Sequence, residues 1–261
     1  MVVCPAENNF GLLSHVCLLC GSYLILCEGL NVEQIPNVLT NMLAACPEMY
    51  RSNLVDCWEA IHHARALTWL SATNVDEAAL DVEMASHYAR ECNGNVHVLV
   101  PGKLLLFPTP AVLPDGQSWA DMNEPDRPTV RLFSAVFLAE LLSELGASSV
   151  ACLDRSAGSD AAAFHASGLD VHDLALDPRR PALLPARDRL RAVARVAPGP
   201  TALFLGNDCA VARWEWVEVL ACAWLMSGFG FGSGAAAAWV RMMCPALGLR
   251  AEVPSGQGRK N

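Results

Sequence analysis

The sequence predicts an α/β protein in which a central, mostly parallel β-sheet is flanked by helices and preceded by a separate helical region. Three features of the 261 residues support this fold class. From residue 96 onward, short apolar runs typical of buried strands alternate with longer helical patterns. Residues 10–70 show helical patterns throughout. The hydrophobic content of 53% is sufficient to bury a full core.

The first region contains three predicted helices. A stub of strand at residues 1–4 precedes a nearly all-apolar helix at residues 10–28, and Gly29 is placed to end that helix. A second helix is predicted at residues 32–43, and an amphipathic third helix at residues 53–70. These helices form the region that precedes the sheet.

An acidic and weakly periodic helix at residues 74–91 leads into the second region. The elements predicted there are two strands at residues 96–100 and 104–107, a surface loop at 108–128, a helix at 130–145 ended by Gly146, a strand at 150–153, a short helix at 160–166 and a strand at 169–174. Because strands and helices alternate, most strand pairs should be parallel.

Charge and cysteine usage exclude several classes of partner and site. A net charge of −9 argues against nucleic acid or an anionic membrane surface as the main partner. The eleven cysteines lie mostly in apolar runs, which favours reduced thiols in the core of an intracellular protein. Residues 12–30 are apolar, but polar residues interrupt them and no basic residue precedes them, so a buried helix is favoured over a membrane span or signal peptide.

No metal site is predicted. Cys17 and Cys20 have the spacing of zinc ligands, but the sequence has no second pair of ligands to complete a zinc site. Both cysteines also lie on an apolar helix. His62 and His63 are adjacent, so they should point to different sides of their helix. A basic cluster is predicted to be a solvated helix face, with a docking patch for an acidic or phosphorylated partner as the alternative: Arg179, Arg180, Arg187, Arg189, Arg191 and Arg195.

The stretch at residues 203–226 carries the most specific signal for function. Residues 203–205 read as a buried strand, Gly206 and Asn207 form a turn, and a helical pattern resumes at Val217. A strand, a turn and a helix in this order direct backbone N–H groups at an anion. Cys209 lies in the turn, where it is a candidate nucleophile; the alternative is a buried structural cysteine.

Residues 208–222 resemble the signature loop of the Cdc-fourteen-like dual-specificity protein phosphatases, a family of the tyrosine-phosphatase superfamily. The family pattern is His-Cys-Lys-Ala-Gly-Leu-Gly-Arg-Thr-Gly-Thr-Leu-Ile-Ala-Cys, and the chain keeps Cys209 and the helix residues 219–222. Residues 96–107 are similar to the family's Trp-Ile-Val-Pro-Gly-Lys-Phe-Leu-Ala-Phe, and residues 238–246 to Ala-Trp-Ile-Arg-x-x-Arg-Pro-Gly. The resemblance therefore extends well beyond the loop.

The resemblance implies a duplicated architecture. Residues 1–72 would be the C-terminal part of a degenerate, non-catalytic phosphatase-like domain, and residues 73–95 a linker helix. Residues 96–250 would be the dual-specificity-phosphatase-like domain, and residues 251–261 a flexible tail. The chain would then begin about two-thirds of the way through the first domain, as a fragment or after loss of the remainder. A strand, a cysteine, a buried helix, a glycine and a further helix recur in both halves, which suggests a degenerate internal repeat.

The departures from the family pattern fall on the chemistry. Asp208 replaces the histidine, and Glu215 stands where the phosphate-binding arginine belongs. Ala210, Val211 and Arg213 complete the degenerate loop. The three glycines are replaced by Ala212, Trp214 and Val217, and the hydroxyl residue by Trp216.

The general acid implied by the resemblance is Asp177. Residues 172–177 resemble the family's His-x-Asp-Leu-x-x-x-Asp, shortened by one residue. In that pattern the last aspartate protonates the leaving oxygen. The alternative is an ordinary loop or helix-capping aspartate before Pro178.

These residues predict a pseudophosphatase that acts as a protein-interaction or structural module. A charge pair about 4 Å apart is worth about 4 kcal/mol at an effective dielectric of about 20, and Glu215 reverses its sign. The alternative is an active enzyme that dephosphorylates serine, threonine and tyrosine through a cysteinyl-phosphate intermediate. An unrelated nucleotide-binding protein would need a glycine-rich loop. We expect no cofactor or metal, a protein partner with phosphoproteins among the candidates, and a cytoplasmic, cytoskeletal or nuclear location.

Overall fold

The computed structural model describes residues 7–72, 78–122, 130–153, 161–174, 183–204 and 212–245. The chain divides into two compact units: the first comprises Met1–Asp81 with Leu225–Trp239, and the second comprises Val82–Trp224 with Val240–Asn261. A stretch from the second half of the sequence thus belongs to the unit of the N-terminal helices. The phosphatase-like identity of the predicted domains stays a prediction.

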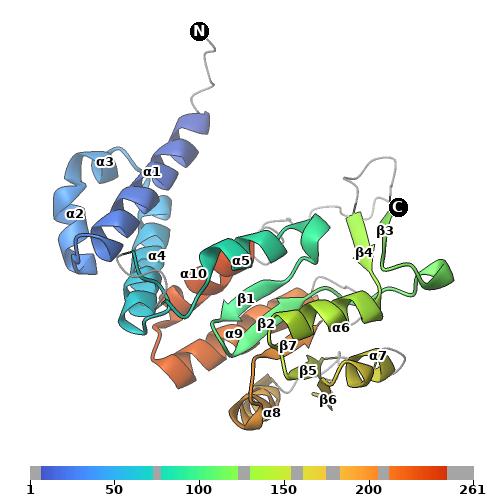
Figure 1. Cartoon of the computed structure of the whole chain (residues 1–261). Helices are drawn as coiled ribbons and strands as arrows, with labels where there is room; N and C mark the ends of the chain where they lie inside the picture. Colours follow the sequence, from blue (N-terminus) through green and yellow to red (C-terminus); the bar gives the residue numbers. More distant parts are fainter. Residues whose placement is uncertain are drawn as a thin grey trace, which may run out of the picture. The chain divides into compact units, whose positions relative to one another are not determined.

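The first unit is helical (Figure 1). Its N-terminal part contains α1 (Glu7–Leu26), η1 (Val32–Gln34), α2 (Ile35–Val38), α3 (Thr40–Ala44) and α4 (Glu48–Ala66). The helices predicted at residues 10–28 and 53–70 are confirmed as α1 and α4, although α4 begins five residues earlier, directly after Pro47.

The single helix predicted at residues 32–43 is wrong, because three short helices occupy this stretch. Pro36 is the second residue of α2 and has no N–H with which to continue a helix from η1. Leu39 then leaves the helical region at φ −98° and ψ 20°, which separates α2 from α3.

Two long helices end in the same way. Gly29 follows α1 with φ +73°, and Gly230 follows α9 (Ala212–Phe229) with φ +77°. In both, the residue after the glycine donates its N–H to the carbonyl six residues earlier, at 3.0 Å and 3.4 Å respectively. Glycine supplies the left-handed backbone at which each of these helices ends. Three short helical segments follow Gly29, whereas the single helix α10 (Ser233–Met243) follows Gly230, and the internal repeat stays a prediction.

Aromatic side chains from both ends of the chain form a cluster in the first unit. The Trp69 ring centroid lies 4.9 Å from that of Phe229, 5.7 Å from Phe231 and 5.4 Å from Trp239. A ring nitrogen of His63, Nε2, lies 2.6 Å from the Phe229 carbonyl oxygen. Residues 225–239 therefore complete the core of the N-terminal helices.

The close packing of α1 on α4 leads to a testable prediction. Trp58 of α4 is fully buried, and a Cβ added at Gly21 of α1 would overlap its indole ring. We expect Gly21→Ala to lower the free energy of unfolding by about 1–3 kcal/mol, as overpacked cores do. Gly11→Ala is the control in the same helix, because a Cβ there meets nothing within 4 Å. The control should be neutral or stabilising by up to about 1 kcal/mol, since alanine favours helices. Urea denaturation of both variants measures the difference, and equal effects would contradict the packing argument.

The second unit is built on a five-stranded sheet. Its strands are β1 (His97–Val100), β2 (Leu104–Phe107), β5 (Ser149–Cys152), β6 (Asp170–Asp173) and β7 (Thr201–Phe204). The spatial order is β1-β2-β7-β5-β6, with β1 antiparallel to β2 and all other pairs parallel. The prediction of a mostly parallel central sheet is confirmed.

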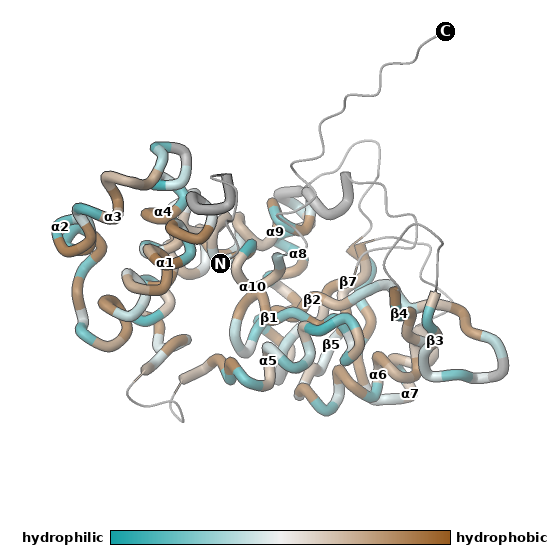
Figure 2. The backbone as a smooth tube through the Cα atoms, turned by 90° about the horizontal axis from the view of Figure 1, so that it is seen from above, coloured by the Kyte–Doolittle hydropathy of each residue, from teal (hydrophilic) through white to brown (hydrophobic). Residues whose placement is uncertain are grey.

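Helices cover both faces of this sheet. Figure 2 shows α6 (Ala135–Glu144) and α7 (Ala161–Ala166) on one side, with α8 (Leu183–Val196) and α9 on the other. All residues of β1, β2, β5 and β7 are buried, as expected for strands enclosed between two helical layers. The helices predicted at residues 74–91 and 160–166 correspond, in the described part of the chain, to α5 (Val82–Tyr88) and α7.

Two predicted elements next to the sheet are wrong. The loop predicted at residues 108–128 contains η4 (Pro114–Gly116) and β3 (Trp119–Met122). The helix predicted at residues 130–145 begins as a strand, β4 (Val130–Phe133), which pairs antiparallel with β3. Ser134 then caps α6, since its Oγ accepts a hydrogen bond from the Phe137 N–H at 3.2 Å. The apolar run continues across this boundary, so cross-strand pairing rather than local pattern separates strand from helix.

Candidate functional site

The predicted catalytic residues lie largely outside the described residues. Cys209, Asp177, Asp208, Ala210 and Val211 are all in segments that the structure does not describe. Ala212, Arg213, Trp214 and Glu215 have a described backbone, which forms the first turn of α9. The described elements that flank these segments therefore define the location of the candidate site.

The strand register brings the flanking elements to one edge of the sheet. Phe204, the last residue of β7, is in register with Phe107 of β2 and Cys152 of β5. Cys152 is in turn in register with Asp173 of β6. Since these strands are parallel, their carboxyl ends meet at the same edge. The central strand, β7, ends at this edge directly before residues 205–211 in the sequence. The strand that precedes the Asp177 segment, β6, ends two strand spacings or about 10 Å away.

This edge has the topology of a ligand crevice. The helix after β5 is α7 and the helix after β7 is α9, and they cover opposite faces of the sheet (Figure 2). Neighbouring parallel strands whose connections diverge in this way leave a crevice outside their carboxyl ends. The segment that carries Cys209 begins at this point.

A cluster of three phenylalanines supports the same edge. The ring centroid of Phe204 lies 5.2 Å from that of Phe107 and 6.1 Å from that of Phe164 on α7, and Phe107 and Phe164 are 5.9 Å apart. All three side chains are at most 1% exposed. Their only signal in the sequence is that Phe107 and Phe204 each end an apolar run. The cluster provides a rigid apolar base beneath the strand ends.

The second cysteine that the resemblance retains, Cys222, is described by the structure. Burial and, to a smaller extent, the negative charge of Glu218 raise the pKa of Cys222 to about 12. Cys222, which the resemblance retains, is therefore a neutral thiol at pH 7 and a poor nucleophile. None of the nine cysteines in the described residues forms a disulfide, and Cys152 at the carboxyl end of β5 is buried.

The basic cluster is partly engaged within the chain. Arg187 forms an ion pair with Asp188 at 2.6 Å, and Arg189 donates to the Leu174 carbonyl at 3.2 Å. Arg189 thereby ties α8 to the residue that follows β6. Arg179 and Arg180 lie outside the described residues. The described part of the cluster thus acts partly in holding the sheet edge, and it gives no specific support to the docking-patch interpretation.

Of the two adjacent histidines, His63 packs against Phe231 with ring centroids 4.4 Å apart. Both His62 and His63 line a cavity of about 400 Å³ in the first unit, together with Glu33 and Glu59. Successive helix residues are separated by about 100°, so a wide cavity can reach two neighbours. Within the described residues, no group of three or more His, Cys, Asp or Glu side chains could hold a metal ion.

Among the helices that the structure describes, none is long and apolar enough to span a membrane.

Neither a scan against protein-family models nor a search of curated proteins found a match to the chain. The candidate site therefore depends on the sequence resemblance and on the geometry of the sheet edge.

Proposed function

We propose that the chain is a Cdc-fourteen-like pseudophosphatase, which uses a phosphatase-type fold as a protein-interaction or structural module. The observation that carries the proposal is the position of the Cys209 segment between β7 and α9. It leaves the central strand of a mostly parallel sheet, at an edge where the strand connections diverge. A cysteine-dependent phosphatase needs this arrangement to direct backbone N–H groups and a helix N-terminus at phosphate.

The start of α9 argues against a working phosphate loop. The backbone is helical from Ala212 onward, so only Ala210 and Val211 separate Cys209 from the helix. Three positions at which the family pattern has glycine, residues 212, 214 and 217, lie inside α9. A loop that wraps around phosphate needs positive φ angles and close backbone approach, whereas a helix supplies neither.

The charge at the helix N-terminus also argues against catalysis. Glu215 is in the first turn of α9, where the helix dipole favours an anion. A carboxylate at this position carries the negative charge that a bound phosphate would otherwise bring, and the two repel each other. The phosphatase pattern places a bidentate arginine there, which attracts phosphate instead.

The alternative function is an active dual-specificity phosphatase, with Cys209 as nucleophile and Asp177 as general acid. Hydrolysis of para-nitrophenyl phosphate separates the two proposals. We expect the purified chain to turn over this substrate no faster than its Cys209→Ser variant at any pH from 5 to 8. Turnover by the unmodified chain that the Cys209→Ser change abolishes would overturn the pseudophosphatase proposal and support the enzyme.

A further inference from the structure

A cavity of about 350 Å³ lies within the second unit, apart from the sheet edge that carries the Cys209 segment. Residues from α5, η3 (Glu91–Asn93), β3, β4 and α6 line it. Its most distinctive side chains are four aromatic rings and two carboxylates: Tyr88, Trp119, Phe133, Phe137, Glu140 and Glu144. We call this cavity the aromatic pocket.

The aromatic wall is built by the β3–β4 hairpin and the start of α6. Trp119 is directly opposite Phe133 in the antiparallel register, so both side chains lie on one face of the hairpin. Phe133 stacks on Phe137 of α6 with ring centroids 5.1 Å apart and an interplanar angle of 14°. Phe133 is 2% exposed, whereas Trp119 is 47% exposed. The wall is therefore anchored in the core at one end and open at the other.

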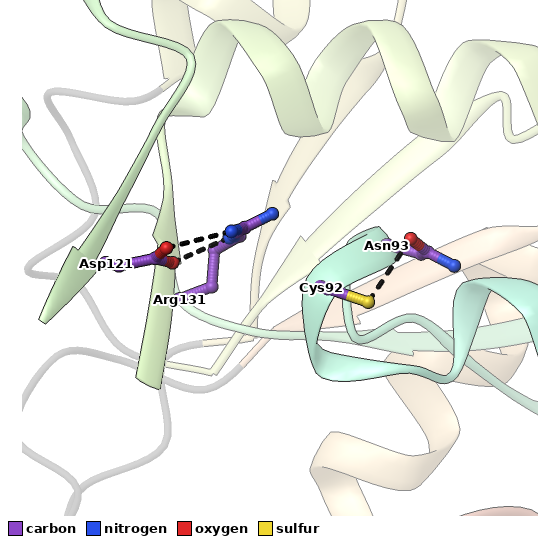
Figure 3. Close-up of polar contacts among 4 residues, drawn as sticks. All are labelled: Cys92, Asn93, Asp121 and Arg131. Atoms are coloured by element: carbon purple, nitrogen blue, oxygen red, sulfur yellow. Dashed lines mark hydrogen bonds and ion pairs between the residues drawn. The ribbon is translucent and has the colours of Figure 1, made fainter. Parts of the chain in front are cut away.

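The opposite side of the pocket is also held in place. Asn93 of η3 donates from Nδ2 to the His87 carbonyl of α5 at 3.0 Å. The Cys92 thiol lies 3.4 Å from Oδ1 of Asn93 (Figure 3). The first contact ties η3 to α5 and the second lies within η3, and residues from both segments line the pocket. The site is thus preformed rather than assembled on binding.

The hairpin already holds one cation against an aromatic ring. The guanidinium carbon of Arg131 lies 3.9 Å from the centroid of the Trp119 ring. Asp121 positions this guanidinium through two hydrogen bonds, at 2.7 and 2.9 Å (Figure 3). Since Asp121 neutralises Arg131, the pair adds no net charge to repel a second cation. The electron-rich ring face attracts cations.

The two carboxylates are in an unfavourable position. Glu140 and Glu144 are one turn apart on α6, where like charges repel. Both are exposed, and neither has an ion-pair partner among the residues that the structure describes. The last turn of α6 contains no basic residue, and the C-terminal end of a helix favours cations. A cation bound in the aromatic pocket would reduce the repulsion between the two carboxylates. It would also supply positive charge at the C-terminal end of α6.

We propose that the aromatic pocket binds an arginine side chain of a partner protein. Its aliphatic stem and planar guanidinium pack against the aromatic wall, and its N–H groups reach Glu140 and Glu144. Arginine fits this combination because it stacks on aromatic rings and forms bidentate bonds with carboxylates. A net charge of −9 favours the approach of a basic partner. The proposal uses no residue of the Cys209 segment, so it stands independently of the pseudophosphatase proposal.

The probe is the capped tripeptide acetyl-Gly-Arg-Gly-amide, with the citrulline peptide as its uncharged isostere. The measurement is the NMR signal of the Trp119 indole N–H in the full chain, assigned through its loss in Trp119→Phe. We expect the arginine peptide to shift this signal saturably, with an affinity on the order of millimolar, and to bind more weakly as salt rises. The citrulline peptide should cause no saturable shift.

The double variant Glu140→Gln, Glu144→Gln tests the carboxylates. We expect it to bind the arginine peptide at least about tenfold more weakly, because each lost bond involves a charged acceptor. The matched control is Glu33→Gln, Glu59→Gln, which removes the same charge from exposed residues of the first unit. The control should bind as the unmodified chain does. An unshifted indole signal, an equal response to citrulline, or equal weakening in the two double variants would overturn the proposal.

Discussion

Replacing residues 208–217 with the phosphatase pattern His-Cys-Lys-Ala-Gly-Leu-Gly-Arg-Thr-Gly is expected to create a vanadate site that the unmodified chain lacks. The replacement returns three glycines to the start of α9, so that the loop can extend and curve around the anion. It also exchanges a carboxylate for a guanidinium at position 215. A single attractive charge pair at about 4 Å is worth about 4 kcal/mol at an effective dielectric of about 20, or roughly a thousandfold in affinity.

Calorimetric titration with vanadate measures this gain. The unmodified chain should show no binding at millimolar concentration, and Glu215→Arg alone should not restore it, because Ala212, Trp214 and Val217 remain. The matched control is the same loop replacement that keeps Glu215, which should also fail to bind. Tight binding by the unmodified chain would show that another group, such as Arg213, forms a vanadate-binding site in place of the missing arginine. Failure of the complete replacement would argue against the phosphatase resemblance itself.

Deleting residues 1–70 is expected to abolish soluble expression of the remaining chain. The deletion removes α1, α4 and Trp69, and with them the partners of an aromatic cluster formed by Phe229, Phe231 and Trp239. Buried aromatic side chains each cover about 150–250 Å², so the exposed patch would reach several hundred Å². Patches of this size promote aggregation or binding to other proteins.

A point variant tests the same contacts without truncation. Trp69 is 5% exposed, and Trp69→Ala should lower the free energy of unfolding by about 3–5 kcal/mol. Trp119→Ala is the control, because its ring is 47% exposed and should contribute much less. Thermal and urea unfolding followed by circular dichroism compare the two. A soluble, cooperatively folding remainder after the deletion, or a neutral Trp69→Ala, would show that residues 225–239 do not depend on the N-terminal helices.

The elements that sequence predicted most accurately are those with strong local signals. The strands at residues 96–100 and 104–107 surround Pro101 and Gly102, and the structure places β1 and β2 within one residue of them. Gly29 was predicted to end the first helix, and it adopts the left-handed backbone that such a cap needs. The prediction at residues 130–145 was wrong because no residue in that apolar run marks the change from strand to helix. The prediction at residues 32–43 was wrong although Pro36 lies within that stretch.

Sequence by itself determined the α/β class and the order of a strand, the Cys209 segment and a helix, because apolar periodicity and turn residues are local properties of the chain. It also determined the charge of Glu215, on which the pseudophosphatase proposal depends. Only the tertiary structure decided that β7 is the central strand and that Trp119, Phe133 and Glu140 border one pocket. Strand order, hairpin register and the seating of a helix on a sheet depend on contacts between residues far apart in sequence. No local pattern contains that information.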